Sequence, residues 1–203
     1  MRALNKTEQY RLKFLTKKQV TLTLIEPTKT GLGKSIMDAT GSVRSFLKTQ
    51  RIHDYEAQRQ GPEHKLRTPA LLYTEKEVIK SSASLYRPRT KKGDPRIWFS
   101  NLKKIASPND IIAIIFHNNQ FHAFNLTKFD IINLMSSGKD HALKLLISEI
   151  SSKANEVAKE LLGKLRAIAQ RGPIPSQVAA DTAVGRTLER VLGINMNASK
   201  QPD

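Results

Sequence analysis

Hydrophobic and polar residues alternate near the start of the chain. Within residues 11–26, Val20, Leu22 and Leu24 are separated by single threonines. A repeat of two residues is typical of a β-strand with one buried face. We therefore expect a strand in this segment, and Pro27 ends it because proline cannot donate a ladder hydrogen bond.

A helical repeat follows between Ser35 and Lys48. Ser35 can cap the helix, and Asp38, three residues later, forms a weak capping box. The apolar residues of this segment fall at helical spacing on one face. They are Ile36, Ala39, Val43, Phe46 and Leu47.

Short extended segments occupy the middle of the chain. They are predicted at residues 51–58, 66–73, 78–86 and 96–99, with a hairpin-like pair at 111–116 and 121–126. The four residues between that pair, 117–120, form a polar turn. Several short strands with one or two short helices favour an α+β fold built on a small β-pseudobarrel or half-open barrel.

The pattern then changes to a long helical repeat. Over Asp140–Gln170 the apolar residues recur every three or four positions, which predicts a helix of about 30 residues, roughly 45 Å long. Such a helix is too long for a compact barrel alone. Residues 171–176 stop it, and a shorter helical pattern covers Thr187–Leu192. We expect a first domain over 1–138, and a linker helix with the start of a second domain over 139–203.

Composition excludes several classes of protein. The chain has 203 residues and no cysteine, which excludes disulfide scaffolds, thiolate zinc sites and cysteine nucleophiles. Its longest apolar stretch, Ile111–Phe116, is far shorter than a membrane span of about 20 residues. Residues 1–6 lack the apolar run of a signal peptide. We therefore expect a cytoplasmic protein that does not bind membranes.

The net charge points to a polyanionic partner. The chain has 34 Lys and Arg against 18 Asp and Glu, a net charge of +16. Residues 1–110 carry 23 basic and 10 acidic side chains, a net of +13, whereas residues 111–203 carry 11 and 8, a net of +3. A charge concentrated in one region favours nucleic acid. Solubility and the general basicity of ribosomal proteins are the alternatives.

The segment 33–35, Gly-Lys-Ser, resembles the end of a phosphate-binding P-loop. That motif also requires a glycine five residues earlier, where the sequence has Thr28, so nucleotide binding is disfavoured. A contact to a DNA phosphate, aided by amide groups at the start of the helix, is favoured instead. The residues predicted for it are Lys29, Thr30, Lys34 and Ser35.

Residues 87–96 form a basic arm between two expected strands. Arginine can hold guanine O6 and N7 together, whereas lysine acts as a point charge on phosphate. Two prolines and a glycine give the arm a defined shape, which favours a reading surface over a solvated hairpin tip. The predicted DNA contacts are Arg87, Arg89, Lys91, Lys92, Asp94 and Arg96.

Residues 52–65 combine acidic, amide and basic side chains. Glutamine can bond adenine N6 and N7, and a carboxylate can accept from cytosine N4. This mixture favours base reading over general attraction to phosphate, and an ordinary polar loop is the alternative. The predicted DNA contacts are His53, Asp54, Tyr55, Glu56, Gln58, Arg59 and Gln60.

Other sites and assemblies are not favoured. The histidines show no metal-ligand spacing with carboxylates, so no metal site is predicted in this chain. His117 and His122 are expected to be exposed beside the hairpin turn. The long helix could form a coiled-coil dimer, but Lys164 interrupts its heptad repeat. Packing against its own domain, in a monomer, is favoured.

The end of the chain resembles the opening of a catalytic domain. The sequences LLGKLRAIA (161–169), RGPIPS (171–176), DTAVGRTLE (181–189), LGI (192–194) and PD (202–203) look like the MvaI/BcnI-type restriction endonucleases. The resemblance implies that Glu189 matches a helix glutamate near the active site. It also implies that Asp203 matches an aspartate that holds Mg²⁺. The (E/D)xK part of the family's motif is missing, so we expect the chain to be inactive alone, as the N-terminal part of a longer type II enzyme.

Residues 10–135 resemble the extra N-terminal domain of some of these enzymes. The matching runs are EPTKTG (26–31), KSIMDAT (34–40), IHDY (52–55), QGP (60–62), SLYRP (84–88) and GDPRIWF (93–99). Such domains are similar to the effector domain of EcoRII and to the pseudobarrel DNA-binding domain of plant transcription factors. In that fold two arms enter the major groove. The resemblance implies one arm from 28–35 with 53–63 and another from 87–96.

Three hypotheses remain open. The favoured one is sequence-specific binding of double-stranded DNA, at a target or effector site, within a bacterial restriction-modification system. The resemblance implies a short CC(A/T)GG-like site, no cofactor for binding, and Mg²⁺ for the full-length nuclease. The second hypothesis is a nuclease active as it stands, against which the missing (E/D)xK argues. The third is non-specific binding of RNA or DNA, although aromatic residues suited to stacking on bases make up only 6% of the chain.

Overall fold

The computed structural model describes residues 1–176 and 182–194. Contacts divide the chain into two compact units, residues 1–151 and residues 152–203. Among the described residues, every strand lies in the first unit, whereas helices occur in both. The predicted α+β class is confirmed. The division falls inside a long helix, so the domain boundary expected at 138–139 stays a prediction.

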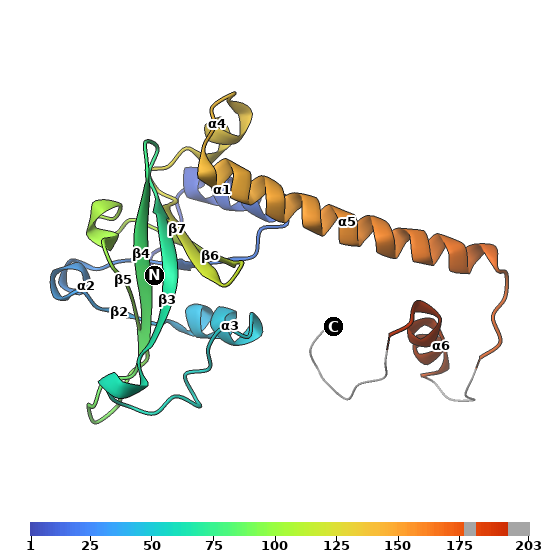
Figure 1. Cartoon of the computed structure of the whole chain (residues 1–203), viewed down its shortest axis with the longest axis horizontal. Coiled ribbons are helices and arrows are strands. Elements are labelled where there is room, and N and C mark those ends of the chain that lie inside the picture. The colour runs from blue at the N-terminus through green and yellow to red at the C-terminus, as the bar shows by residue number, and fades with distance from the viewer. Residues whose placement is uncertain (177–181, 195–203) are drawn as a thin grey trace. The chain divides into compact units, whose positions relative to one another are not determined.

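Seven strands form one curled sheet in the shape of a half-barrel (Figure 1). They are β1 Leu22–Ile25, β2 Met37–Asp38, β3 Leu66–Tyr73, β4 Val78–Tyr86, β5 Arg96–Phe99, β6 Ile112–His117 and β7 Gln120–Asn125. Their order is β1-β6-β7-β3-β4-β5-β2, and all neighbours are antiparallel except β3 and β7. β1 and β2 are therefore the two edges, and residues 26–36 connect one edge to the other.

The helices are α1 Lys6–Lys17, α2 Lys29–Lys34, α3 Gly41–Thr49, α4 Ile131–Ser136, α5 Ala142–Gln170 and α6 Ala183–Leu192. Two short 3-10 turns, η1 Pro62–His64 and η2 Leu102–Lys104, follow α3 and β5. The long helix expected over 140–170 is confirmed as α5. α6 contains the shorter helical pattern.

The strand expected over residues 11–26 is wrong in its first half, where α1 lies. Asn5 and Glu8 start this helix with a reciprocal capping box. The Asn5 side chain accepts from the Glu8 N–H, and the Glu8 carboxylate accepts from the Asn5 N–H, both at 2.9 Å. This pair is a helix-start signal, and only the alternating residues after Val20 form a strand.

The single helix expected over residues 35–48 is also wrong. Ser35 instead ends α2 in the left-handed conformation, with a φ of 57°. β2 then pairs with β5, and the Ala39 N–H donates to the Pro95 carbonyl at 2.9 Å. α3 begins only at Gly41. The apolar residues that suggested one helix come from separate elements that share one core.

Of the remaining strand predictions, one is wrong and the others are confirmed. Residues 51–58 form turns and bends rather than a strand. The strands expected at 66–73, 78–86 and 96–99 are confirmed as β3, β4 and β5. The expected hairpin is β6 and β7, and both residues of its turn, Asn118–Asn119, have positive φ values of 50° and 58°. That conformation is typical of a type I′ turn, which matches the twist of a hairpin.

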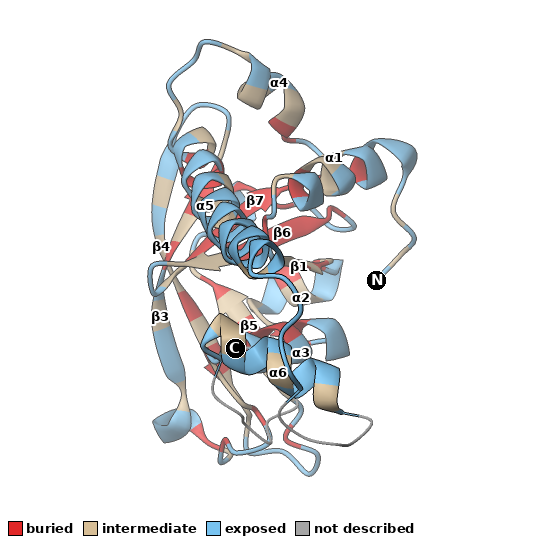
Figure 2. Ribbon diagram, turned by 90° about the vertical axis from the view of Figure 1, so that its right-hand side faces the viewer, coloured by how far each residue is buried: buried red, intermediate tan, exposed pale blue. Residues whose placement is uncertain are grey.

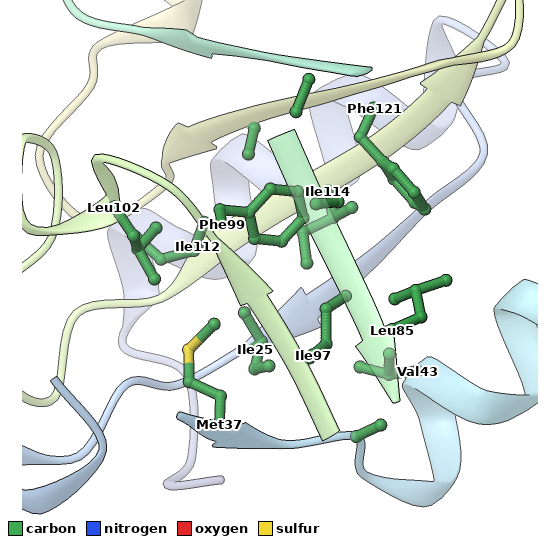
Figure 3. Close-up of a cluster of buried hydrophobic side chains, with 14 of the residues drawn as sticks. Ile25, Met37, Val43, Leu85, Ile97, Phe99, Leu102, Ile112, Ile114 and Phe121 are labelled. Atoms are coloured by element: carbon green, nitrogen blue, oxygen red, sulfur yellow. The ribbon is translucent and has the colours of Figure 1, made fainter. Parts of the chain in front are cut away.

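The centre of the sheet, β6 and β7, is buried on both faces. Ile112 and Ile114 of β6 join a cluster with α3, β4 and β5, which Figure 3 shows converging around Phe99. Ala113 and Ile115, which alternate with them, join a second cluster with α1, α4 and the start of α5. Figure 2 shows the buried residues gathered along β6 and β7. Burial on both faces explains why residues 112–116 of β6 are all apolar.

Candidate nucleic-acid interface

Two loops at one end of the β3–β4 hairpin carry most of the predicted DNA contacts. The first, residues 53–64, leads from α3 into β3, and the second, residues 87–95, connects β4 to β5. We refer to them as the paired loops, because they are hydrogen-bonded to each other. The Gly61 N–H donates to the Arg87 carbonyl at 2.9 Å. The expected grouping of 53–63 with 28–35 is therefore corrected: the first loop is joined to 87–95.

Arg87 connects the paired loops through its half-buried side chain. Its Nε donates to the Gly93 carbonyl at 2.9 Å. Its Nη1 donates to the carbonyls of Tyr55 at 3.3 Å and Gln58 at 3.2 Å. The guanidinium is thus engaged with backbone from both loops.

Tyr55 and Gln58, both predicted to contact DNA, are buried between the loops. The Tyr55 hydroxyl donates to the Arg96 carbonyl at 2.8 Å, and burial raises the pKa of this hydroxyl. The Gln58 Nε2 donates to the carbonyls of His64 at 2.7 Å and Leu85 at 3.1 Å. Both side chains hold the loops in place rather than face solvent.

His53 and Gln60 are half-buried beside these supports. The His53 ring lies edge-on to Tyr55, with centroids 4.5 Å apart, and burial lowers the pKa of its imidazole. Gly93, with a φ of +59°, lies directly against the Gln60 side chain, and a Cβ there would be 2.1 Å from the amide nitrogen. The two loops therefore approach each other as closely as a glycine permits.

The outer surface of the paired loops is polar and mostly basic. Arg59, Lys91, Lys92 and Asp94 are exposed. Arg89 is also exposed, and its Nη2 pairs with Glu63 at 2.5 Å across the two loops. These side chains are accessible to a partner.

Asp54 and Glu56 of the first loop pair with a residue of α3. The Lys48 ammonium lies 3.1 Å from the Asp54 carboxylate and 2.6 Å from that of Glu56. The Glu56 backbone N–H, followed by Lys48, holds the pKa of Asp54 below its usual value. Lys48 therefore offsets two negative charges on an otherwise basic surface.

Two clefts flank the start of α3. One, of about 460 Å³, lies between α3 and the paired loops and is lined by Arg44, Lys48, Glu56 and Arg87. The other, of about 560 Å³, lies by the edge strands and is lined by Thr30, Lys34, Ser42 and Arg96. Gly41 lines both clefts. The clefts therefore link the paired loops, α3 and residues 28–34 into one surface.

Residues 29–34 form the helix α2 with Thr28 and Ser35 as its caps, whereas a loop was expected, and the predicted contact of this segment with a DNA phosphate stays a prediction. The Thr28 hydroxyl accepts from the Gly31 N–H at 2.9 Å and caps the helix. Lys29, Thr30 and Lys34 are exposed, whereas Ser35 ends the helix and is half-buried. The helix start that was expected to offer amide groups at Ser35 lies instead at Gly41.

Arg96 connects this region to β5. It is half-buried and lines the larger cleft with Lys34, and its buried Nε has no hydrogen-bond partner among the described residues. Sequence reasoning missed Arg44 and Lys48, which lie four residues apart on the exposed side of α3. Their spacing was a usable signal, but the misplaced helix start concealed which face they occupy.

The histidines of the hairpin differ from expectation. His122 is buried in β7, where its Nδ1 lies 2.7 Å from the Tyr73 hydroxyl and burial lowers its pKa. His117 is only partly exposed, and its Nε2 lies 3.1 Å from the Glu149 carboxylate of α5. Exposure of both residues beside the turn is therefore corrected.

The described residues do not assemble a metal centre. No group of three or more His, Asp or Glu side chains among them could hold a metal ion. Glu189 is exposed on α6, and Asp203 lies outside the described residues. Within the described part of the chain, Glu189 by itself does not supply the several oxygen ligands that a catalytic Mg²⁺ site needs. No helix in the described part of the chain is both long and apolar enough to cross a membrane.

Comparison with known protein families gives a match at the end of the chain. The sequence model of the MvaI/BcnI restriction endonuclease family matches residues 162–203. This supports the resemblance inferred for the end of the chain, which includes the last turns of α5 and all of α6. No curated protein and no solved structure matches the chain. The resemblance of residues 10–135 to an effector domain stays a prediction.

Proposed function

We propose that the first unit binds double-stranded DNA and reads its sequence. The observation that carries this proposal is the joining of the paired loops, α3 and α2 around two clefts. Basic side chains gather on this surface, which suits a polyanion. They are Lys29, Lys34, Arg44, Arg59, Arg89, Lys91, Lys92 and Arg96.

Two kinds of contact are proposed on this surface. Lys29, Lys34, Lys91 and Lys92 are exposed point charges that position the protein on phosphates. Arg89 projects from a loop braced at both ends by strands, and it reads guanine once its exposed pairing with Glu63 opens. The major groove is wide enough to admit such a loop pair.

The family match gives this binding a context. Restriction endonucleases act on DNA, so we propose that the first unit is the target or effector-site module of a type II restriction endonuclease in a bacterial restriction-modification system. A short CC(A/T)GG-like site is the sequence that the resemblance suggests. The resemblance suggests Mg²⁺ for DNA cleavage, and DNA binding by the first unit is proposed to need no cofactor.

Selection from random duplex DNA tests the proposal. The chain is mixed with the library at about 100–150 mM salt, where non-specific binding is weak, and the retained DNA is sequenced. Enrichment of one short, near-palindromic motif is expected. Retention without enrichment, lost steeply as salt rises, would contradict sequence reading and favour the non-specific alternative. Preference for single-stranded RNA would favour an RNA-binding protein.

Three single variants locate the surface. Arg89→Ala should cost about 1–3 kcal/mol of binding free energy on the selected DNA and less on random DNA. Lys91→Ala should weaken both alike and reduce the slope of log K against log salt by about 0.9. Lys76→Ala is the matched control, because this exposed lysine lies in the turn at the opposite end of the β3–β4 hairpin. An equal effect of Lys76→Ala and Lys91→Ala would contradict the assigned surface.

A further inference from the structure

We infer that Arg87 is a positioning residue, which locks the paired loops into one preassembled arm and does not itself contact DNA. This inference rests on the proposed function of the first unit. It changes the role expected from sequence, where Arg87 was a base reader. It also assigns the reading of DNA to the exposed side chains that the locked arm presents.

The hydrogen bonds of Arg87 leave it unable to grip a guanine. Gripping O6 and N7 together requires two adjacent N–H groups, from Nη2 with either Nε or Nη1. The single Nε hydrogen is used on the Gly93 carbonyl. Nη1 donates to the carbonyls of both Tyr55 and Gln58. Each pair of adjacent N–H groups that could hold a guanine, Nη2 with Nε or Nη2 with Nη1, therefore includes a donor that is already engaged.

The acceptors of Arg87 come from both loops. Tyr55 and Gln58 belong to the first loop and Gly93 to the second, so one side chain fixes their separation. Arginine suits this role because its planar fork keeps several donors in fixed directions. A lysine ammonium at the same place could not span three carbonyls with that geometry.

Three other contacts reinforce the same lock. The Gln58 amide donates to the Leu85 carbonyl at 3.1 Å, and the Tyr55 hydroxyl donates to the Arg96 carbonyl at 2.8 Å. These bonds hold the first loop to both strands that carry the second. Gly93 completes the contact, because its φ of +59° is one that L side chains rarely adopt and a Cβ there would meet the Gln60 side chain. The paired loops therefore keep their arrangement in the protein without DNA.

A preassembled arm has a definite consequence for binding. Ordering flexible loops on binding costs free energy, and a loop pair that is already fixed avoids that cost. Base reading depends on accurate placement, whereas attraction to phosphates tolerates displacement. Loosening the lock should therefore weaken binding to the selected sequence more than binding to random DNA.

Arg87→Lys is the first test, because it retains the positive charge. Amide hydrogen exchange of residues 53–64 and 87–95 should accelerate in the free variant, while exchange of β6 and β7 stays unchanged. Affinity for the selected DNA should fall about tenfold or more, with a much smaller loss on random DNA. The slope of log K against log salt should stay the same, because no phosphate contact is lost.

Two further variants keep the test decisive if Arg87→Lys does not fold. Tyr55→Phe removes only the hydroxyl that donates to Arg96, and Gly93→Ala inserts a methyl group between the loops; both leave Arg87 in place. Each should accelerate exchange in the paired loops and reduce discrimination, Tyr55→Phe the less of the two. Lys92→Ala is the contrasting control, expected to reduce the salt slope by about 0.9 and leave exchange unchanged.

The inference and the proposed function fail in different ways. A reduced salt slope in Arg87→Lys with unchanged exchange would show that Arg87 contacts phosphate, which overturns the inference. Equal losses on selected and random DNA would overturn it too. If the unaltered chain enriches no sequence, the proposed function fails instead, and the exchange data alone decide whether Arg87 locks the loops.

Discussion

The buried carboxylate of Glu8 shows how a single residue holds the first unit together. Glu8 of α1 is fully buried and accepts hydrogen bonds from Arg2, the Asn5 backbone and the Thr127 hydroxyl. These donors, with Arg2 contributing most, lower the pKa of Glu8 to about 2. One side chain therefore caps α1 and also fastens it to the segment after β7. Its ionised form is the one that the fold stabilises.

The pH dependence of stability should report this carboxylate. Because the pKa is lower in the folded chain, the stabilisation is complete above the unfolded value near 4.5 and is lost as the pH falls toward 2. We expect Glu8→Gln to reduce the free energy of unfolding at pH 7 by about 2 kcal/mol, allowing for screening around the partly exposed Arg2. Urea unfolding at pH 7, 5, 3 and 2 measures this free energy of unfolding. Glu75→Gln, which changes an exposed carboxylate in a turn, is the control. Parallel curves for Glu8→Gln and the unaltered chain would contradict the assignment.

At the scale of elements, α2 shows how a six-residue helix is fitted to its surroundings. It connects the edge strands and lines the larger cleft. Gly31 faces inward, where a Cβ would lie 2.6 Å from the Ile36 carbonyl oxygen. Gly33, two residues later, has open space around its Cβ position. The two glycines of this helix therefore serve different purposes.

Alanine at these two glycines should have opposite effects. Gly31→Ala should destabilise the protein by about 1–3 kcal/mol, because the backbone carbonyl it meets cannot move without shifting the chain. Gly33→Ala should stabilise it by about 0.5–1 kcal/mol, because alanine restricts the unfolded chain and favours a helix. Thermal unfolding of the two variants and of the unaltered chain measures these changes in stability. A gain of stability in Gly31→Ala would contradict the close approach at Gly31, and a loss in Gly33→Ala would contradict the open space at Gly33.

At the scale of the whole molecule, the two units differ in how they are built. The first encloses two hydrophobic clusters around a seven-strand sheet. The second consists, in its described residues, of the exposed part of α5 together with α6. The family match lies in the second unit, whereas the proposed DNA surface lies in the first. Binding and nuclease resemblance are therefore assigned to different parts of the chain.

This separation predicts binding without cleavage. The chain incubated with Mg²⁺ and the selected DNA should leave the duplex intact, because no group of three or more His, Asp or Glu side chains among the described residues could hold a metal ion. Glu189→Ala should bind that DNA with unchanged affinity. Gel analysis of the DNA and a binding titration measure both quantities. Mg²⁺-dependent cleavage that Glu189→Ala abolishes would show a nuclease active as it stands.

The sequence by itself determined the elements whose local pattern is unambiguous. β3, β4 and β5, the β6–β7 hairpin and the long α5 were all predicted, because short apolar runs bounded by turn residues mark the strands and helical spacing persists along α5. It also determined the similarity of residues 162–203 to a restriction endonuclease family. Charge along the chain identified the basic first half, since net charge requires no knowledge of contacts.

Only the tertiary structure decided which predicted contacts face outward and which are used internally. Arg87, Tyr55 and Gln58 have side chains suited to DNA, yet each is engaged by carbonyls from distant segments. The segment 35–48 looked like one helix because residues of separate elements enter the same core, and pairing of β2 with β5 divides it. Long-range hydrogen bonds and shared burial leave no periodic trace in the sequence, so the arrangement of the paired loops appears only once the chain is folded.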